Sequence, residues 1–491
     1  MPSINNFLFG LLSLDATPTQ TTSEVLACLT ALLEDNEALA QKVVGSEDWF
    51  NKLIQIKDSN STNVLAACGV LHNLFVSLKW YDHNTPIEGA SDATLIPKLV
   101  QFMDRTEIET STNGHSKHSS PDQVLQLALE ITASIATSLQ EALEHGSHYE
   151  KEFQGFDDAE LMNEDAEEMG INREDDGEAK ARQDEMDAEA HAAEDGEMNE
   201  DEMDADMELV TGHGSDVEET ASEDSTLERL VRIAAGYALL LAIEKNNNTS
   251  HAISTLNNIA WTVSTIDFST GHLDNLYNFW VSLTQRIWKE VISPILAADT
   301  ADIELASIVT SLAWAVSRSV KGVINIKPGE QRKFMALYEA SKNLSSAENG
   351  AAKVLDSGDD AFQGLGVKCI GVLGSLALDP APIDLNKEIG EFLLTVLASL
   401  PDTPPADTVE ALNQLFDIYA DKEYSFDEPV FWGYNFLKHL EEIQPKAKRM
   451  SKEIDKRLFP ELRGRADEAV LNLDRFLIYK RKEKKALKGR N

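Results

Sequence analysis

Few residues of this chain have the types and spacing that chemistry requires. His115 with His118, and His145 with His148, are spaced like metal ligands, but neither pair has a cysteine or a spaced carboxylate beside it. Gly364–Gly366 and Gly371–Gly374 resemble phosphate-binding turns, but no strand precedes them, so close packing between helices explains these glycines better. No nucleophile elbow or acid–base pair stands out. We therefore expect a protein that is not an enzyme and needs no cofactor or metal.

The charge of the chain indicates what it binds instead. The formal net charge is −41, and residues 157–224 hold 29 aspartates or glutamates against three basic residues. Such a span lacks the apolar residues to fold alone, and its field attracts basic partners and disfavours direct binding to DNA. We predict a mostly disordered acidic insert, with a solvated spacer as the alternative. The candidate contacts for a basic client are Asp157, Asp158, Glu164, Asp165, Glu167, Glu168, Asp184, Glu185, Glu200, Asp201, Glu202 and Asp204.

The cysteines and the apolar runs indicate where the protein resides. Cys28, Cys68 and Cys369 lie far apart in apolar surroundings, which is typical of free buried thiols in a reducing compartment. No stretch has the roughly 18 uncharged apolar residues of a membrane helix, and no secretory signal opens the chain. We expect a protein of the cytoplasm or nucleus without a membrane partner.

Helical periodicity governs the chain on both sides of the insert. Apolar residues recur three or four apart, and strand alternation does not persist anywhere. The expected fold class is all-α, an armadillo/HEAT-type α-solenoid with a long disordered acidic insert, and we expect a monomer. The predicted domains are armadillo-like repeats over 1–150, the insert over 151–226, HEAT-like repeats over 227–482 and a basic tail over 483–491. The last predicted helices are 406–420, 429–443 and 446–482, the final one broken near Pro460.

A short pattern returns along the helical parts. It consists of an aliphatic residue, any residue, a small polar residue, Leu or Ile, then Ala or Phe, as in Leu71–Phe75 and Leu256–Ala260. In a solenoid, stacked repeats share one core, and one helix of each repeat lines a binding face. The polar residues and two tryptophans three positions later are candidates to bind an extended peptide, although helix contact and core packing remain alternatives. These groove candidates are Asn73, Asn258, Trp261, Ser311, Trp314, Ser375 and Gln414.

The C-terminal end has the opposite charge. Residues 446–491 carry 16 basic against seven acidic residues. This end could pair with the acidic insert, bind RNA, act as a nuclear localisation signal or simply be a solvated helix end, and the mixed signs favour the signal over RNA binding. Its candidate residues are Lys480, Arg481, Lys482, Lys484 and Lys485.

Several strings of residues resemble the symportin family. They are Ala67–Phe75, Trp80–His83, Leu412–Asp421, Phe426–Phe431, Arg475–Phe476 and Tyr479–Lys482. The resemblance implies an armadillo/HEAT adaptor that gathers the two ribosomal proteins bound to 5S ribosomal RNA and escorts them into the nucleus with an importin-β-family receptor. It assigns the insert to an L5-type partner and the groove to a basic segment of an L18-type partner.

Two further expectations accompany the resemblance. Family members begin with an import signal that contains a Pro-Tyr pair, and no Pro-Tyr occurs in this sequence, so either the sequence is truncated or import uses the C-terminal basic run. The competing interpretation is a histone chaperone or acidic chromatin scaffold, which would also join an acidic tract to a helical platform. An adaptor would shuttle between cytoplasm and nucleus and serve assembly of the large ribosomal subunit.

Overall fold

The computed structural model describes residues 4–14, 17–104, 121–146, 225–244, 248–298, 303–347 and 361–489. Within these ranges the regular structure is helical and contains no strand, as the periodicity predicts. The N-terminal helices are α1 (Ile4–Ser13), α2 (Thr19–Leu33), α3 (Glu37–Gly45), α4 (Glu47–Lys57), α5 (Val64–Ser77), α6 (Ile96–Met103) and α8 (Pro121–Gly146). After the insert come α12 (Thr226–Arg229), α13 (Ala235–Ile243), α14 (Thr249–Ser264), α15 (Asp274–Ile287), α16 (Ser293–Ala297), α17 (Ile303–Ser319) and α18 (Glu330–Ala347). The chain ends with α20 (Leu365–Ala377), α21 (Ile383–Ala398), α22 (Pro405–Ile418), α23 (Phe436–Glu453) and α24 (Pro460–Gly489).

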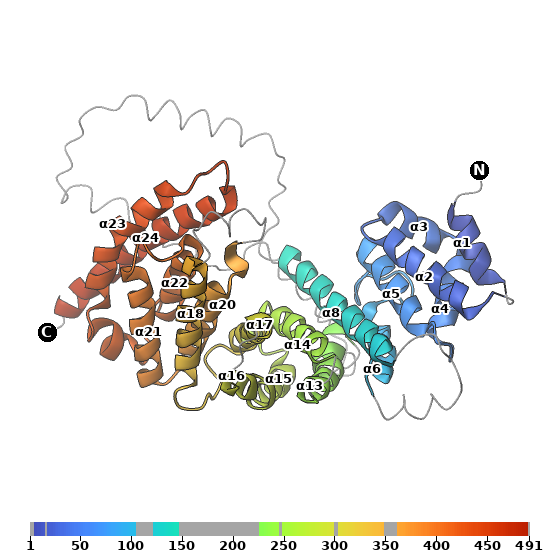
Figure 1. Ribbon diagram of the computed structural model, residues 1–491, viewed down its shortest axis with the longest axis horizontal. Coiled ribbons are helices and arrows are strands. Elements are labelled where there is room, and N and C mark those ends of the chain that lie inside the picture. Colours follow the sequence, from blue (N-terminus) through green and yellow to red (C-terminus); the bar gives the residue numbers. More distant parts are fainter. Residues whose placement is uncertain are drawn as a thin grey trace.

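One row of helices runs through the whole molecule. Helices α2, α5, α8, α14, α17, α20, α22 and α24 each pack against the next in this order, and we call this row the stack. The other helices form a second layer against it; α13 packs on α14, α18 on α20, α21 on α22 and α23 on α24. Figure 1 shows the result, an elongated array in which the colours follow one another from the N-terminal to the C-terminal repeats. This is the arrangement of an α-solenoid, in which a repeat touches mainly its neighbours.

Two stack helices, α5 and α20, are apolar all round, and neighbours cover them on several sides. In α20 every residue from Cys369 to Ala377 is buried, and α5 is buried over most of its length. A helix of this composition requires a buried position. The predicted role of the glycines in close helix packing is confirmed: a side chain at Gly371 would collide with the indole of Trp314, and one at Gly374 with the side chain of Gln414.

The C-terminal helices depart from the expected boundaries. Helix α23 runs through Pro445, so the predicted break between residues 443 and 446 is wrong, whereas the predicted break near Pro460 is confirmed. Residues 427–432 form a π-helical turn ahead of α23. Helix α24 continues to Gly489, so most of the predicted basic tail belongs to this helix. The proline is tolerated because α23 packs on α24, and tertiary packing outweighs local propensity.

A buried cation fastens α24 to the rest of the fold. The Nζ atom of Lys480 is 2.7 Å from Oδ1 of Asp427 and 3.0 Å from Oε2 of Glu483, and the lysine is 0% exposed. The same ammonium lies 4.7 Å from the ring centre of Phe431. Asp427 also accepts a hydrogen bond of 2.9 Å from Nε1 of Trp432. A buried charge is tolerated only with such partners, so this cluster fixes the position of α24.

None of the described helices is both long and apolar enough to cross a membrane. No group of three or more potential ligands in the described part of the chain is arranged to hold a metal ion.

The close approach at α20 can be tested with two glycine substitutions. We expect Gly371→Ala to lower the free energy of unfolding by about 1–3 kcal/mol, because Trp314 must move to admit the new methyl group. Gly464→Ala is the control, since nothing lies within 4 Å of that position in α24, and it should be neutral or stabilise by about 0.5–1 kcal/mol. Urea unfolding followed by circular dichroism measures both, and equal effects would contradict the proposed close contact.

The buried cation can be tested in the same assay. Lys480→Met leaves the carboxylates of Asp427 and Glu483 buried without their partner, which we expect to cost about 3–5 kcal/mol. The control is Arg481→Met, which breaks an exposed 2.8 Å ion pair with Glu441 and should cost less than about 1 kcal/mol. A Lys480→Met variant as stable as the control would show that α24 does not depend on this cluster.

Candidate functional site

The predicted asparagines lie on the stack, where they join neighbouring helices. The Nδ2 atom of Asn73 on α5 donates a 2.9 Å hydrogen bond to the carbonyl oxygen of Thr30 on α2. Asn258 on α14 repeats this contact with α8, donating from Nδ2 to the carbonyl oxygen of Ala133 at 3.4 Å and to Oγ1 of Thr137 at 3.1 Å. These amide groups therefore satisfy backbone carbonyls inside the solenoid, which is the helix-contact alternative of the sequence analysis.

The two predicted tryptophans meet across the stack. The rings of Trp261 and Trp314 are 5.2 Å apart with an interplanar angle of 77°, a T-shaped contact between α14 and α17. The guanidinium of Arg318 lies 5.7 Å from the ring centre of Trp261. Trp314 also covers Gly371 of α20, so this pair links three successive stack helices. Both tryptophans stay half-buried, so part of each remains accessible to a ligand.

The other predicted groove residues separate into two groups. Ser311, one turn before Trp314 on α17, is half-buried. Ser375 and Gln414 are buried, at 3% and 6% exposure. The Ser375 hydroxyl donates to the carbonyl oxygen of Gly371 at 2.9 Å, and Gln414 donates to Oε1 of Glu410 at 2.8 Å. Neither side chain is offered to a peptide, because α20 and α22 approach too closely, and this part of the prediction is corrected.

Two charged residues of the same region were not singled out from the sequence. Arg318 follows Trp314 by one helical turn, and Glu410 precedes Gln414 by one turn. Arg318 is exposed and Glu410 half-buried. Burial raises the pKa of Glu410 to about 7, against the opposing effects of the Gln414 hydrogen bond and the Arg318 charge. Each of them lies four residues from a candidate groove residue, Trp314 or Gln414, and this spacing was the signal that could have identified them.

The predicted client contacts of the insert, from Asp157 to Asp204, lie outside the described residues. At the C-terminal end Lys480 is buried and paired with Asp427, so the prediction that it is an accessible residue of a transport signal is wrong. Arg481 is exposed but paired with Glu441. Lys482, Lys484 and Lys485 are exposed on α24 and remain the candidates for a transport signal.

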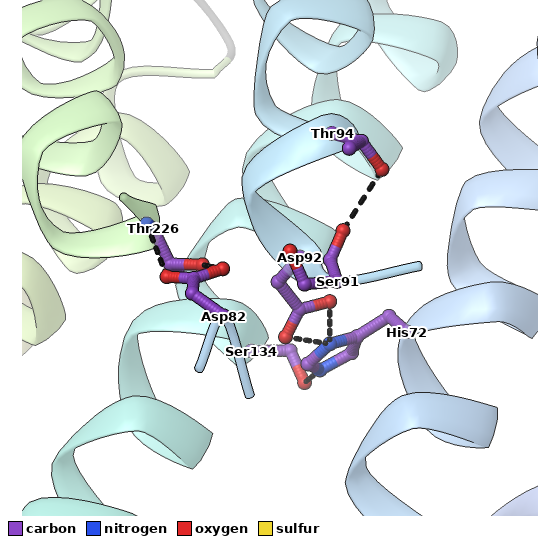
Figure 2. Close-up of polar contacts among 7 residues, drawn as sticks. All are labelled: His72, Asp82, Ser91, Asp92, Thr94, Ser134 and Thr226. Atoms are coloured by element: carbon purple, nitrogen blue, oxygen red, sulfur yellow. Dashed lines mark hydrogen bonds and ion pairs between the residues drawn. The ribbon is translucent and has the colours of Figure 1, made fainter. Parts of the chain in front are cut away.

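A polar cluster joins the N-terminal repeats to α8 (Figure 2). Nδ1 of His72 lies 3.0 Å from Oδ1 of Asp92, and Nε2 lies 2.9 Å from Oγ of Ser134. This order of groups matches that of serine hydrolases. Ser134 lies in the middle of α8, where neighbouring backbone N–H groups donate within the helix and so are not free to stabilise an oxyanion. We therefore assign these contacts to holding α5, residues 92–94 and α8 together.

Thr226, at the start of the second helical part, is held by a residue of the N-terminal repeats. Asp82 accepts hydrogen bonds from the backbone N–H of Thr226 at 2.7 Å and from its hydroxyl at 2.9 Å, as Figure 2 shows. Ser225 caps α12 by accepting from the N–H of Glu228. A cavity of about 10 Å³ beside these groups, enough for one water molecule, is lined in part by Asp82, Asp92 and Thr226. Contacts across 144 residues of sequence thus join the two helical parts.

Comparison with known proteins places this geometry in a family. Residues 241–484 match the family described as SYO1-like, TPR repeats. The chain is 41% identical to Symportin 1 of Chaetomium thermophilum over 518 residues, which cover 98% of this chain and 72% of that protein. It is 30% identical over 237 residues to the Schizosaccharomyces pombe armadillo repeat protein involved in nucleocytoplasmic transport Syo2, covering 47% of this chain and 32% of that protein.

A further relative is Synchronized import protein 1 of Saccharomyces cerevisiae, 38% identical over 117 residues, which cover 24% of this chain and 19% of that protein. The near-complete match to Symportin 1 agrees with the resemblance seen in the sequence and with the helical repeats of the structure. The chain therefore belongs to the symportin family.

Proposed function

We propose that this chain is a transport adaptor and dedicated chaperone for the basic ribosomal proteins of the 5S particle. It binds an L18-type and an L5-type protein as a monomer, travels with them between cytoplasm and nucleus, and delivers them for assembly of the large subunit. The observation that carries the proposal is the 41% identity to Symportin 1 over 98% of the chain. The names of two other relatives refer to import and nucleocytoplasmic transport, which supports the same role.

The distribution of charge supports basic clients. Residues 157–224 account for most of the net negative charge, −26 of −41, with 29 acidic residues against three basic ones. In this proposal they cover the RNA-binding face of the L5-type client, which suppresses its aggregation until RNA displaces it. Opposite charges accelerate encounter and confer selectivity, and their effect weakens as salt rises.

The open face of the stack supports an extended client segment. Trp261 on α14 and Ser311 and Trp314 on α17 are half-buried there, and they form a short row across two successive stack helices. In this proposal a segment of the L18-type client lies along this row, contacting the tryptophans. An importin-β-family receptor then engages the C-terminal basic residues Lys482, Lys484 and Lys485.

The insert can be tested by changing its charge at constant length. A variant with the acidic residues of 157–224 replaced by their amides should bind a labelled L5-type protein at least about tenfold more weakly at low salt, with the difference narrowing as salt increases. An insert of the same composition in scrambled order is the control, and should retain binding if charge is the determinant. Fluorescence anisotropy over a salt series measures all three. Core histones bound more tightly than the ribosomal protein would instead favour a histone chaperone.

The stack face can be tested by blocking and by truncation. Ser311→Arg places a long side chain on the face, and should weaken binding of a basic L18-type segment by about tenfold or more, since each tenfold is only about 1.4 kcal/mol. Asn278→Arg on the exposed surface of α15, in the second layer, is the matched control. Trp261→Ala combined with Trp314→Ala should also weaken binding while the chain stays helical. Unchanged affinity in all variants would assign both tryptophans to packing alone.

A further inference from the structure

Side chains of the two neighbouring stack helices cover α20 at two glycines. Gly371 and Gly374 are three residues apart, so they share one face of α20. Trp314 from α17 covers the first glycine and Gln414 from α22 covers the second. Because these glycines have no side chain, α17 and α22 can pack closely against α20.

Two opposite charges lie one helical turn from these covering side chains and do not pair with each other. Arg318 lies one turn beyond Trp314, and Glu410 lies one turn before Gln414. The charges of Arg318 and of Arg465 from α24 act on Glu410, but no ion pair within 4 Å joins either arginine to it in the described structure. Both charged groups are therefore available to a group of a ligand.

Glu410 has one oxygen without a partner. Its Oε1 accepts the 2.8 Å hydrogen bond from Nε2 of Gln414, whereas Oε2 has no hydrogen bond from a described residue. The side chain is half-buried, so its ionised form lacks both full hydration and full hydrogen bonding. An ammonium or guanidinium group of a ligand would donate to this oxygen and, like the charges of Arg318 and Arg465, favour the ionised form of Glu410.

We propose that Glu410 is the subsite that receives a lysine or arginine side chain of an extended client segment lying over the exposed positions of α17 and α22, which cover α20. This inference rests on the proposed function and names the chemistry by which one position of the stack reads a basic client. Arg318 then donates to a carbonyl of the same segment, because its guanidinium has no carboxylate partner among the described residues. Neither residue belongs to the set predicted from the sequence.

The subsite links client binding to proton release. Burial raises the pKa of Glu410 to about 7, so about half of these carboxyl groups carry a proton at pH 7. A bound cation favours the ionised form and lowers the pKa, so the proton leaves on binding and affinity rises with pH. The charges that face Glu410 are Arg318 from α17, Asp417 on α22 and Arg465 from α24. The arginines stay charged throughout this range.

A second acidic group of α22 must be separated from this effect. Asp407 is buried against Gly366 of α20, and burial raises its pKa to about 7 as well. It is 8% exposed, so it is out of reach of a client. Asp407→Asn is therefore the matched control for proton release.

The experiment is calorimetric titration of the full chain with a histidine-free, lysine-containing segment of an L18-type protein at pH 6, 7 and 8, in buffers of different ionisation enthalpy. The wild-type chain should release about half a proton at pH 7 and bind about tenfold more tightly at pH 8 than at pH 6. Glu410→Gln should lose both effects and bind with the weaker affinity at every pH, whereas Asp407→Asn should keep them. Circular dichroism checks that each variant is folded.

The outcomes separate this inference from the proposed function. If the wild-type chain binds the segment with an affinity independent of pH, and Glu410→Gln matches it, the cation subsite is wrong and the adaptor proposal stands. If the wild-type chain does not bind the segment, the proposed role of the stack fails and the subsite fails with it. Loss of proton release in Asp407→Asn rather than Glu410→Gln would also overturn the assignment.

Discussion

Close contact between successive stack helices is the constraint on which the rest of this structure depends. A single repeat cannot bury its own apolar face, so each helix of the stack must approach its neighbour along its length. At α20 the close approach requires Gly371 and Gly374, because Trp314 and Gln414 occupy the space that side chains at these two positions would need. At α5 and α14 it is reinforced by Asn73 and Asn258, which bond carbonyls of the preceding stack helix. The packing that builds the solenoid therefore also determines which side chains are exposed on its face.

The sequence predicted the architecture better than the site. Helical periodicity, the all-helical fold and the packing role of the α20 glycines follow from local spacing, which a sequence records directly. The direction of a small polar side chain does not, so Ser375 and Gln414 resembled groove residues and proved buried. Lys480 belongs to a basic run, and only the fold brings Asp427 from 53 residues away to bury it. Pro445 lies inside a helix because packing of α23 on α24 outweighs its local cost.

The charges of the chain are divided between two kinds of surface. The acidic residues concentrate in 157–224, whereas the described stack face around α20 carries both signs, including Arg318 and Glu410. A uniform acidic surface would attract any basic protein, and a mixed one selects by position. In this account the insert supplies attraction over distance and the stack supplies the register of an extended segment. Asp82 joins the two helical parts of the chain, because it accepts hydrogen bonds from Thr226 at the start of the second one.

The central claim is that a basic client segment lies across the stack face and not across the second layer. Photo-crosslinking tests this most directly, with a photoreactive amino acid placed at Ser311 on α17 or at Asn278 on α15 of the full chain, mixed with an L18-type protein. The account predicts crosslinks from position 311, mapped to a lysine- or arginine-rich segment of the client, and few from position 278. Equal crosslinking from both positions, or crosslinks from position 278 alone, would contradict it.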